Sequence, residues 1–320
     1  MPTSTATTKT MTNLCALVLV ARGQLDPFAP VARYWPEFAA NGKEGIEVRH
    51  LLSHTSGVSG WEQPVQVSDI YDWERSTSML AAQAPWWEPG TKSGYHGLTQ
   101  GYLVGEVVRQ VTGHTVGQFF ASEIGGPMGA DFHIGLDPVH DARVAPVIPP
   151  SMPAGGGGAA SSGLDKESVP YKTWISPRLD AEQSYDLAWR RAEIPAAGGH
   201  GNARGVALAQ AAVSCPEVNG VSLLSRNQVE RIFDEQSNGP DMVIGDVFRF
   251  GVGWALSSPD LVVPISDRSC FWGGWGGSLV VNDVDRQMTM AFVMNRMGEG
   301  TVGDERSRPL LEAATAAVDA

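Results

Sequence analysis

Apolar residues recur at helical spacing at the very start of the chain. Met11, Leu14, Cys15 and Val18 share one face of a helix over Thr8 to Arg22, and Gly23 ends the pattern. A helix with this pattern is expected to be buried in the core. Buried helices need covering elements, and no sequence before this helix supplies them.

Further helices are predicted through the first half of the chain, each with capping residues at its ends. An amphipathic helix over Ser68 to Gln83 is capped by Ser68 with Asp69 in its first turn, a second covers Thr99 to Val111 and ends at Gly113, and a short third covers Val116 to Glu123. The stretch from Ile46 to Leu52 leads into a polar turn over residues 53–57.

The second half of the chain changes character. Residues 137–200 are rich in Pro and Gly and have no clean period, so we expect long surface loops that shape a cleft, with a mobile linker as the alternative. Helices and then strands are expected after residue 202. They cover Ala203 to Ser214, Gln228 to Asp234, the strand-like runs Phe248 to Leu256, Leu261 to Ile265, Gly277 to Asn282 and Met288 to Asn295, and a closing helix from Arg308 to Val318.

This order predicts an α+β fold rather than alternating βαβ units, because the helices come first and the strands follow as a meander. We expect a mainly helical part over residues 1–202 and an α/β part with an antiparallel sheet and a C-terminal helix over residues 203–320.

Composition narrows the function. The chain has 320 residues, 42% hydrophobic and 18% charged, and a net charge of -12. This acidic balance disfavours nucleic acid, which is bound through clustered Lys and Arg. Three distant cysteines without paired spacing indicate a reduced, cytoplasmic setting. The longest apolar run, Leu14 to Ala21, is too short to span a bilayer, so no membrane partner is expected.

Lys9 is the first candidate for chemistry. It stands at the start of the first predicted helix, where backbone N–H groups and the positive end of the helix dipole stabilise an oxyanion. A lysine one turn into such a helix can exchange protons with the residue at its first position, which suits acyl transfer.

A series of motifs follows Lys9 in order. It comprises Thr7-Thr8-Lys9-Thr10, Gly23-Gln24-Leu25-Asp26, Tyr34-Trp35-Pro36, His50-Leu51-Leu52-Ser53-His54-Thr55-Ser56-Gly57, Tyr95, and Trp272-Gly273-Gly274. In order and spacing this series resembles the serine β-lactamase and penicillin-binding superfamily, and within it the family VIII carboxylesterases, which are similar to class C β-lactamases. The resemblance implies a β-lactamase-like fold and an acyl-serine mechanism that needs no cofactor or metal.

The resemblance implies a role for each residue of this chain that matches a catalytic motif of the family. Lys9 matches the lysine of the family's S-x-x-K motif, but the serine position is Ala6, and no other lysine has serine three positions upstream. Tyr95 matches the tyrosine that shuttles protons, although Gly97 stands where its asparagine companion is usual. The chain is therefore expected to be impaired as a hydrolase.

Trp272-Gly273-Gly274 stands where β-lactamases carry K-T-G, just before a predicted strand. The resemblance implies that this ribbon lines the substrate and that the N–H of Trp275 serves as an oxyanion donor beside that of Ala6. Tryptophan in place of lysine removes a carboxylate anchor. Small esters are therefore the expected substrates, with cephalosporins as a side activity.

Other readings of the same residues stay open. His50 and His54 share the i, i+4 spacing of zinc ligands, but the glutamate of H-E-x-x-H is missing and a structural turn is preferred. No G-x-S-x-G is present, which argues against an α/β-hydrolase. The alternatives are a β-lactamase, a D-amino-acid peptidase or an acyltransferase, and, from another class, a non-catalytic ligand-binding pseudoenzyme.

Two departures from the family pattern generate hypotheses. We interpret Ala6 as an engineered replacement of serine rather than natural decay, because the flanking motif is intact. Relatives carry a helix and strands before the S-x-x-K helix, whereas five residues precede Ala6 here. A sheet edge left unpaired in this way predicts lowered stability or a homo-oligomer.

Overall fold

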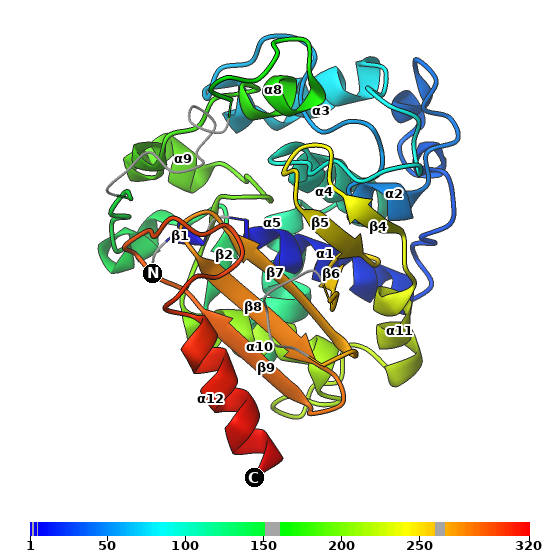
Figure 1. Cartoon of the computed structure of the whole chain (residues 1–320). Helices are drawn as coiled ribbons and strands as arrows, with labels where there is room; N and C mark the ends of the chain where they lie inside the picture. Colours follow the sequence, from blue (N-terminus) through cyan, green and yellow to red (C-terminus); the bar gives the residue numbers. More distant parts are fainter. Residues whose placement is uncertain (2, 5, 151–160, 260–265) are drawn as a thin grey trace.

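The computed structural model describes residues 1, 3–4, 6–150, 161–259 and 266–320. A six-stranded antiparallel sheet lies against α-helices. Beyond one end of it gather the helices α2 (Val48–Leu52), α3 (Trp73–Ala82), α4 (Thr99–Thr112) and α8 (Val169–Trp174) (Figure 1). The predicted α+β architecture with an antiparallel sheet is confirmed. In the described part of the chain, no helix has the length and apolar character needed to cross a membrane.

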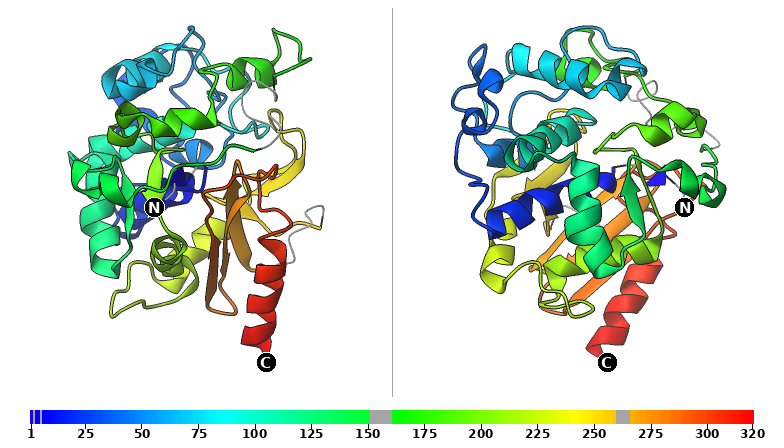
Figure 2. Two further views of the ribbon diagram at one scale, coloured as in Figure 1. Left: turned by 90° about the vertical axis from the view of Figure 1, so that its left-hand side faces the viewer. Right: turned by 180° about the vertical axis from the view of Figure 1, so that it is seen from behind.

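The large sheet has the order β4-β5-β6-β7-β8-β9. Its strands are β4 (Ser237–Pro240), β5 (Val247–Phe250), β6 (Ala255–Leu256), β7 (Ser269–Gly274), β8 (Ser278–Asp283) and β9 (Met288–Phe292). Every residue of β7 and β8 is buried, because helices cover both faces of the sheet. Figure 2 shows α10 (Ala203–Ser214) and α12 (Arg308–Asp319) on opposite faces of it.

Helix α1 (Thr8–Ala21) is the central helix of the molecule, as its apolar period predicts. All its residues from Thr8 to Leu19 are buried. The covering elements come from later in the chain, since α1 contacts α4 (Thr99–Thr112), α5 (Val116–Phe120), α10 and α11 (Arg226–Glu230). Its N-terminal end is fixed by a small sheet in which β3 (Gly199–Gly201) lies between β1 (Thr3–Ser4) and β2 (Phe132–Ile134).

The remaining helices are short, and α2 and α3 among them contact α4. The α-helical and π-helical segments are α2 (Val48–Leu52), α3 (Trp73–Ala82), η4 (Ala121–Gly125), α6 (Gly126–Met128), α8 (Val169–Trp174) and α9 (Leu187–Arg191). The 3-10 segments are η1 (Val31–Arg33), η2 (Pro36–Ala39), η3 (Asp69–Tyr71), η5 (Pro138–Arg143), η6 (Ala181–Tyr185) and η7 (Arg231–Phe233).

The prediction of one helix over Ser68 to Gln83 is wrong at its start. The chain forms η3 first and then begins α3 at Trp73, because the carboxylate of Asp72 accepts a hydrogen bond from Arg75 N at 3.0 Å. Asp72 therefore caps the helix, and Ser68 has no side-chain capping bond. Two capping residues four apart compete here, and the carboxylate prevails.

The single strand predicted over Phe248 to Leu256 is two strands, β5 and β6. The intervening glycines reverse the chain, and Gly253 adopts a φ of +95° that favours glycine. Trp272 to Gly274 form the end of β7, a strand that the sequence did not predict, and they precede β8, the strand predicted from Gly277. The run Leu261 to Ile265 lies outside the described residues, so the strand predicted there stays a prediction.

The predicted loop region over residues 137–200 contains short helices where it is described, namely η5, α8, η6 and α9, joined by irregular segments. Their caps are local: the side chains of Ser168 and Asp180 accept hydrogen bonds from backbone N–H groups of α8 and η6. Short capped turns of this kind have no long apolar period, which is why the pattern of the sequence did not indicate them.

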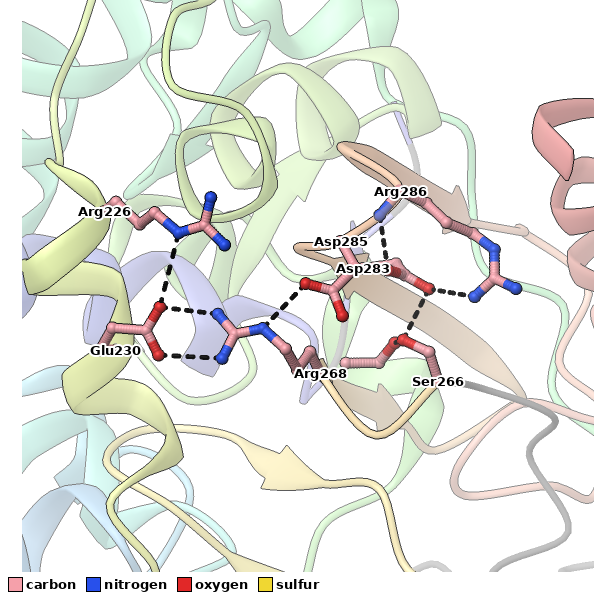
Figure 3. Close-up of polar contacts among 8 residues, drawn as sticks. Arg226, Glu230, Ser266, Arg268, Asp283, Asp285 and Arg286 are labelled. Atoms are coloured by element: carbon pink, nitrogen blue, oxygen red, sulfur yellow. Dashed lines mark hydrogen bonds and ion pairs between the residues drawn. The ribbon is translucent and has the colours of Figure 1, made fainter.

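A network of ion pairs joins the sheet to its neighbouring helix (Figure 3). The guanidinium of Arg268 donates to both carboxylate oxygens of Glu230 in α11, at 2.7 and 3.0 Å, and to Asp285 at 2.9 Å. Asp283 at the end of β8 accepts from Arg286 Nη1 at 2.9 Å. The side chains of Glu230, Arg268 and Asp285 are partly exposed, so their pairs contribute little free energy of unfolding and mainly fix the position of α11. The carboxylate of Asp283 is buried.

A second, buried polar network crosses the core. Gln210 in α10 is fully buried, its Nε2 donates to Thr10 O at 3.0 Å, and its Oε1 accepts from Trp254 Nε1 at 3.2 Å and from Asn282 Nδ2 at 3.1 Å. One amide side chain thus satisfies groups of α1, the sheet and the loop between β5 and β6. Buried polar networks of this kind depend on every member being paired.

The change Gln210→Leu should lower the free energy of unfolding by about 2–4 kcal/mol, because it removes three buried hydrogen bonds. Urea denaturation followed by tryptophan fluorescence measures this loss. Gln63→Leu, at an exposed position in a loop, is the control and should change stability by less than about 0.5 kcal/mol. Equal effects of the two changes would contradict the role of Gln210.

Candidate active site

Ala6 and Lys9 lie at the N-terminal end of α1, on consecutive turns. Lys9 N donates to Ala6 O at 3.0 Å, which brings the lysine back beneath residue 6. The Lys9 side chain is only 2% exposed, and its Nζ donates to Gly97 O at 2.7 Å and to Ala196 O at 3.1 Å. Burial holds the pKa of Lys9 well below its ordinary value. The site thus contains an amine that gives up its proton more readily than an exposed lysine.

Tyr95 covers this amine. Lys9 Nζ lies 4.8 Å from the centre of the Tyr95 ring. The tyrosine is 7% exposed, and burial raises the pKa of its hydroxyl, while the Trp272 indole acts in the opposite direction. Tyr95 and Trp272 have ring centres 5.4 Å apart. Ala6 packs against the same aromatic cluster, so the positions named from the sequence lie together.

The ribbon from Trp272 to Trp275 comes from the end of β7 and the turn that follows. Gly276 and Gly277 continue this turn with φ values of +96° and +95°, a backbone conformation that residues other than glycine rarely adopt. Arg306 holds the turn from behind, because its Nη2 donates to Gly276 O at 2.7 Å. A rigid backbone of this kind can present N–H groups to a substrate oxygen.

A direct contact joins the ribbon to the start of α1. Ser278 is the first residue of β8, and its Oγ lies 2.8 Å from Thr7 Oγ1 in a buried hydrogen bond. Gly199 N in β3 donates to Thr8 Oγ1 at 3.0 Å, which ties the next residue to the small sheet. The position of Ala6 is therefore set from both sheets.

A cavity of about 570 Å³ opens onto these residues. Ala6, Tyr95, Trp272, Gly273, Gly274 and Trp275 all line it. Parts of the region from 164 to 189, where the sequence predicted loops that shape a cleft, form another wall. The remaining walls are segments that the sequence did not single out, namely residues 242–246 between β4 and β5 and residues 297–302 after β9. Lys9 is not part of the lining and lies behind Ala6 and Tyr95.

Asp241 is a residue of the site that the sequence reasoning missed. It is 1% exposed, and its Oδ1 accepts from Tyr95 N at 3.0 Å, Val243 N at 2.9 Å and Ile244 N at 3.0 Å. One buried carboxylate thereby fixes the tyrosine segment and the cavity wall of residues 242–246 relative to each other. An aspartate between Pro240 and Met242 has no pattern that indicates this role.

The histidines of the polar turn are structural in their contacts. His50 Nδ1 accepts from Glu47 N at 3.2 Å within the capping box of α2, and His54 Nδ1 accepts from His96 N at 3.1 Å. His54 also adopts a positive φ of 61°. No group of three or more His, Cys, Asp or Glu able to hold a metal ion is present among the residues that the structure describes. The preferred reading of this segment as a structural turn is consistent with these contacts.

His96, directly after Tyr95, is fully buried and lies between two partners. Its Nδ1 is 2.6 Å from Gly94 O, and its Nε2 is 2.7 Å from Ser56 Oγ. The carbonyl can only accept, so Nδ1 carries the proton and Nε2 accepts from the Ser56 hydroxyl. Burial lowers the pKa of His96 to about 3. This neutral histidine connects the polar turn to the segment that carries Tyr95.

Comparison with known proteins gives one consistent result. The family model described as Beta-lactamase matches residues 5–315. The esterase/beta-lactamase LipL of Mycobacterium tuberculosis is 32% identical over 299 residues, which cover 91% of this chain and 68% of LipL. The crystal structure of a family VIII carboxylesterase matches with a TM-score of 0.89 and 38% identity, covering 98% of this chain and 82% of that one. A penicillin-binding protein homolog from Caulobacter crescentus matches with a TM-score of 0.88 and 34% identity, covering 98% and 83%.

Buried neutral histidines make the fold sensitive to acid. Burial lowers the pKa of His96 to about 3 and that of His200 to about 4, whereas both take up protons near pH 6.5 when unfolded. The stability they provide is fully present above about pH 6.5 and is lost as the pH falls toward the folded values. Each should contribute a slope of about 1.4 kcal/mol per pH unit between pH 6 and 5.

Replacing His96→Gln should remove one such slope from the pH dependence of the free energy of unfolding, measured by urea denaturation at several pH values. The exposed His114 is the matched control, and His114→Gln should leave the dependence unchanged. A His96→Gln protein with the original slope would show that His96 is protonated in the fold.

Proposed function

We propose that this chain, which belongs to the beta-lactamase family, carries the active site of a carboxylesterase-type serine hydrolase in which Ala6 occupies the nucleophile position. The observation that supports this most is the amine of Lys9, buried beneath the Tyr95 ring directly behind Ala6 at the edge of the cavity. The matched relatives, which are named as an esterase/beta-lactamase and a carboxylesterase, agree with the reaction class.

The proposed reaction places a serine hydroxyl where the Ala6 methyl lies. Lys9, whose pKa burial holds well below its ordinary value, takes the hydroxyl proton as the serine oxygen attacks the ester carbonyl carbon. The carbonyl oxygen becomes an oxyanion that accepts from the N–H groups of residue 6 and Trp275. The bond to the alcohol oxygen then breaks, and Tyr95 passes the proton to that oxygen. Water attacks the acyl-serine by the same route and releases the acid.

The chain as it stands lacks the oxygen nucleophile. Losing the nucleophile of a serine hydrolase can reduce turnover about a million-fold, while the cavity and the oxyanion donors remain. We therefore expect it to bind esters intact and to hydrolyse them barely or not at all. Ala6 also favours a second candidate function, a non-catalytic protein that uses the cavity to bind a ligand.

The same acyl-serine chemistry would serve a β-lactamase, a D-amino-acid peptidase or an acyltransferase. The likeness to a penicillin-binding protein homolog at 34% identity keeps β-lactams among the candidate substrates. Assaying the serine-restored protein with nitrocefin and with a D-alanyl peptide, beside an ester, separates these activities. Turnover of the ester alone is the result expected here.

Ala6→Ser should raise the hydrolysis of p-nitrophenyl butyrate by about ten thousand-fold or more, because it restores the nucleophile beside a prepared base. Ala6→Gly, which adds no oxygen, is the matched control and should give no gain. Adding Lys9→Met or Tyr95→Phe to Ala6→Ser should remove most of the gain. A folded Ala6→Ser protein that binds esters without hydrolysing them would refute the hydrolase and favour the binding protein.

A further inference from the structure

A second hollow is separate from the cavity beside Ala6. It has a volume of about 410 Å³ and lies between residues 42–46 and residues 85–89, with His50 of α2 in its lining. In the described part of the chain, no residue lines both spaces. Pockets of a few hundred Å³ can enclose a small ligand, so this hollow is a candidate binding site of its own.

Two consecutive tryptophans, Trp86 and Trp87, form the aromatic part of the hollow. Both are half-buried, and their inner ends are packed against the chain. A Cβ atom added at Gly60 would lie 2.9 Å from Trp86 Cη2, and one added at Gly94 would lie 2.6 Å from Trp87 Cη2. Trp87 Nε1 also donates to Lys92 O at 3.0 Å. The two rings are therefore fixed before a ligand arrives, which lowers the entropy lost on binding.

The charge of the hollow is negative. Glu88 is the one charged residue among the described residues that line it, and its side chain is exposed. Lys43 stands between two lining positions but points elsewhere, because its side chain is buried and its Nζ donates to Ala40 O at 2.7 Å and to Ala81 O at 2.9 Å. A cation in the hollow thus meets a carboxylate and two tryptophans, the side chains whose rings attract cations most strongly.

His50 adds a hydrogen-bond donor to the hollow. Its side chain is 8% exposed, and its Nδ1 accepts from Glu47 N at 3.2 Å. Burial lowers the pKa of His50, which favours the neutral ring, so the ring proton lies on Nε2. Nε2 makes no hydrogen bond within the described part of the chain and is not enclosed, so its N–H can donate to a ligand.

These features restrict the chemistry of the ligand. An anion would lose its water beside Glu88 without gaining a cation. A sugar or a primary amine carries several O–H or N–H groups that need acceptors, and Glu88 is the one free side-chain acceptor in the described lining. A quaternary ammonium has no N–H group, so aromatic walls and one carboxylate satisfy it. An oxygen on the same ligand would serve the His50 donor.

We propose that this hollow binds a small quaternary ammonium alcohol of the choline type. Its ammonium lies beside the two tryptophans and the Glu88 carboxylate, and its hydroxyl oxygen accepts from His50 Nε2. The site is outside the cavity of Ala6, so the inference does not depend on the proposed hydrolysis. Its residues bind a ligand and take no part in catalysis.

The first experiment compares choline with 3,3-dimethyl-1-butanol, which has the same shape and carbon in place of the charged nitrogen. Ligand-observed NMR titration of the chain at constant ionic strength should give a Kd for choline at least about tenfold lower, because only the cation is attracted by the tryptophans and the carboxylate. Equal affinities for the two compounds, or no binding of choline, would overturn the proposal.

The second experiment locates the site with Glu88→Gln. This change removes the lining charge, so the Kd of choline should rise about two- to fivefold, the effect of losing an exposed ion pair. Glu62→Gln, at an exposed position outside the hollow, changes the net charge equally and should leave the Kd unchanged. The same loss in both variants would show that choline responds to the charge of the whole molecule and not to this hollow.

The third experiment tests the His50 donor with ethyltrimethylammonium, which is choline without its oxygen. It should bind the parent chain about three- to tenfold more weakly than choline, because it cannot accept from Nε2. In His50→Phe, with the fold checked by circular dichroism, the two cations should bind equally. Equal binding of the two cations to the parent chain would refute the role of His50 even if His50→Phe does not fold.

Discussion

The burial of the Lys9 amine is the constraint on which the rest of the site depends. An ammonium group held out of water is costly unless it is paired, and among the described residues it meets two backbone carbonyls and the face of Tyr95. The environment therefore favours the neutral amine, which is the form able to accept a proton. A lysine at the same position on an exposed helix would remain protonated at neutral pH and could not act as a base.

Three distant parts of the chain have to meet for this environment to exist. The end of α1 brings Ala6 and Lys9, the segment after the polar turn brings Tyr95, and β7 brings the Trp272 ribbon. Buried hydrogen bonds fix these parts: one joins Thr7 and Ser278, and in another Tyr95 N donates to the carboxylate of Asp241. Because α1 is surrounded by helices and lies beside the sheet, its N-terminal end cannot shift without disturbing the core.

The sequence predicted the helices that are specified by residues close together in the chain. The bounds of α1, α4 and α10 follow from their apolar period and their ends, and Gly113 closes α4 in the left-handed conformation, as expected. The ordered motifs indicated the family and which residues to examine. Competition between nearby caps, as at Ser68 and Asp72, was not decided by the sequence, because either residue can cap a helix.

Contacts between distant residues could not be predicted in this way. Asp241 acts on Tyr95, which is 146 positions away, and no spacing or period joins the two. Part of the cavity wall comes from short capped turns between residues 164 and 189. The sequence predicted cleft-shaping loops in this region, but its weak hydrophobic pattern did not indicate the turns themselves. The size of the cavity follows from the packing of these segments.

The central claim is that residue 6 is the position of the nucleophile, activated by the buried Lys9 amine. Intact-mass and peptide mass spectrometry of the Ala6→Ser protein after treatment with an alkyl fluorophosphonate tests it most directly. The account predicts one phosphonyl adduct per chain on residue 6, absent from the Ala6 protein and strongly slowed by Lys9→Met. An adduct on another serine, or none on a folded protein, would contradict it.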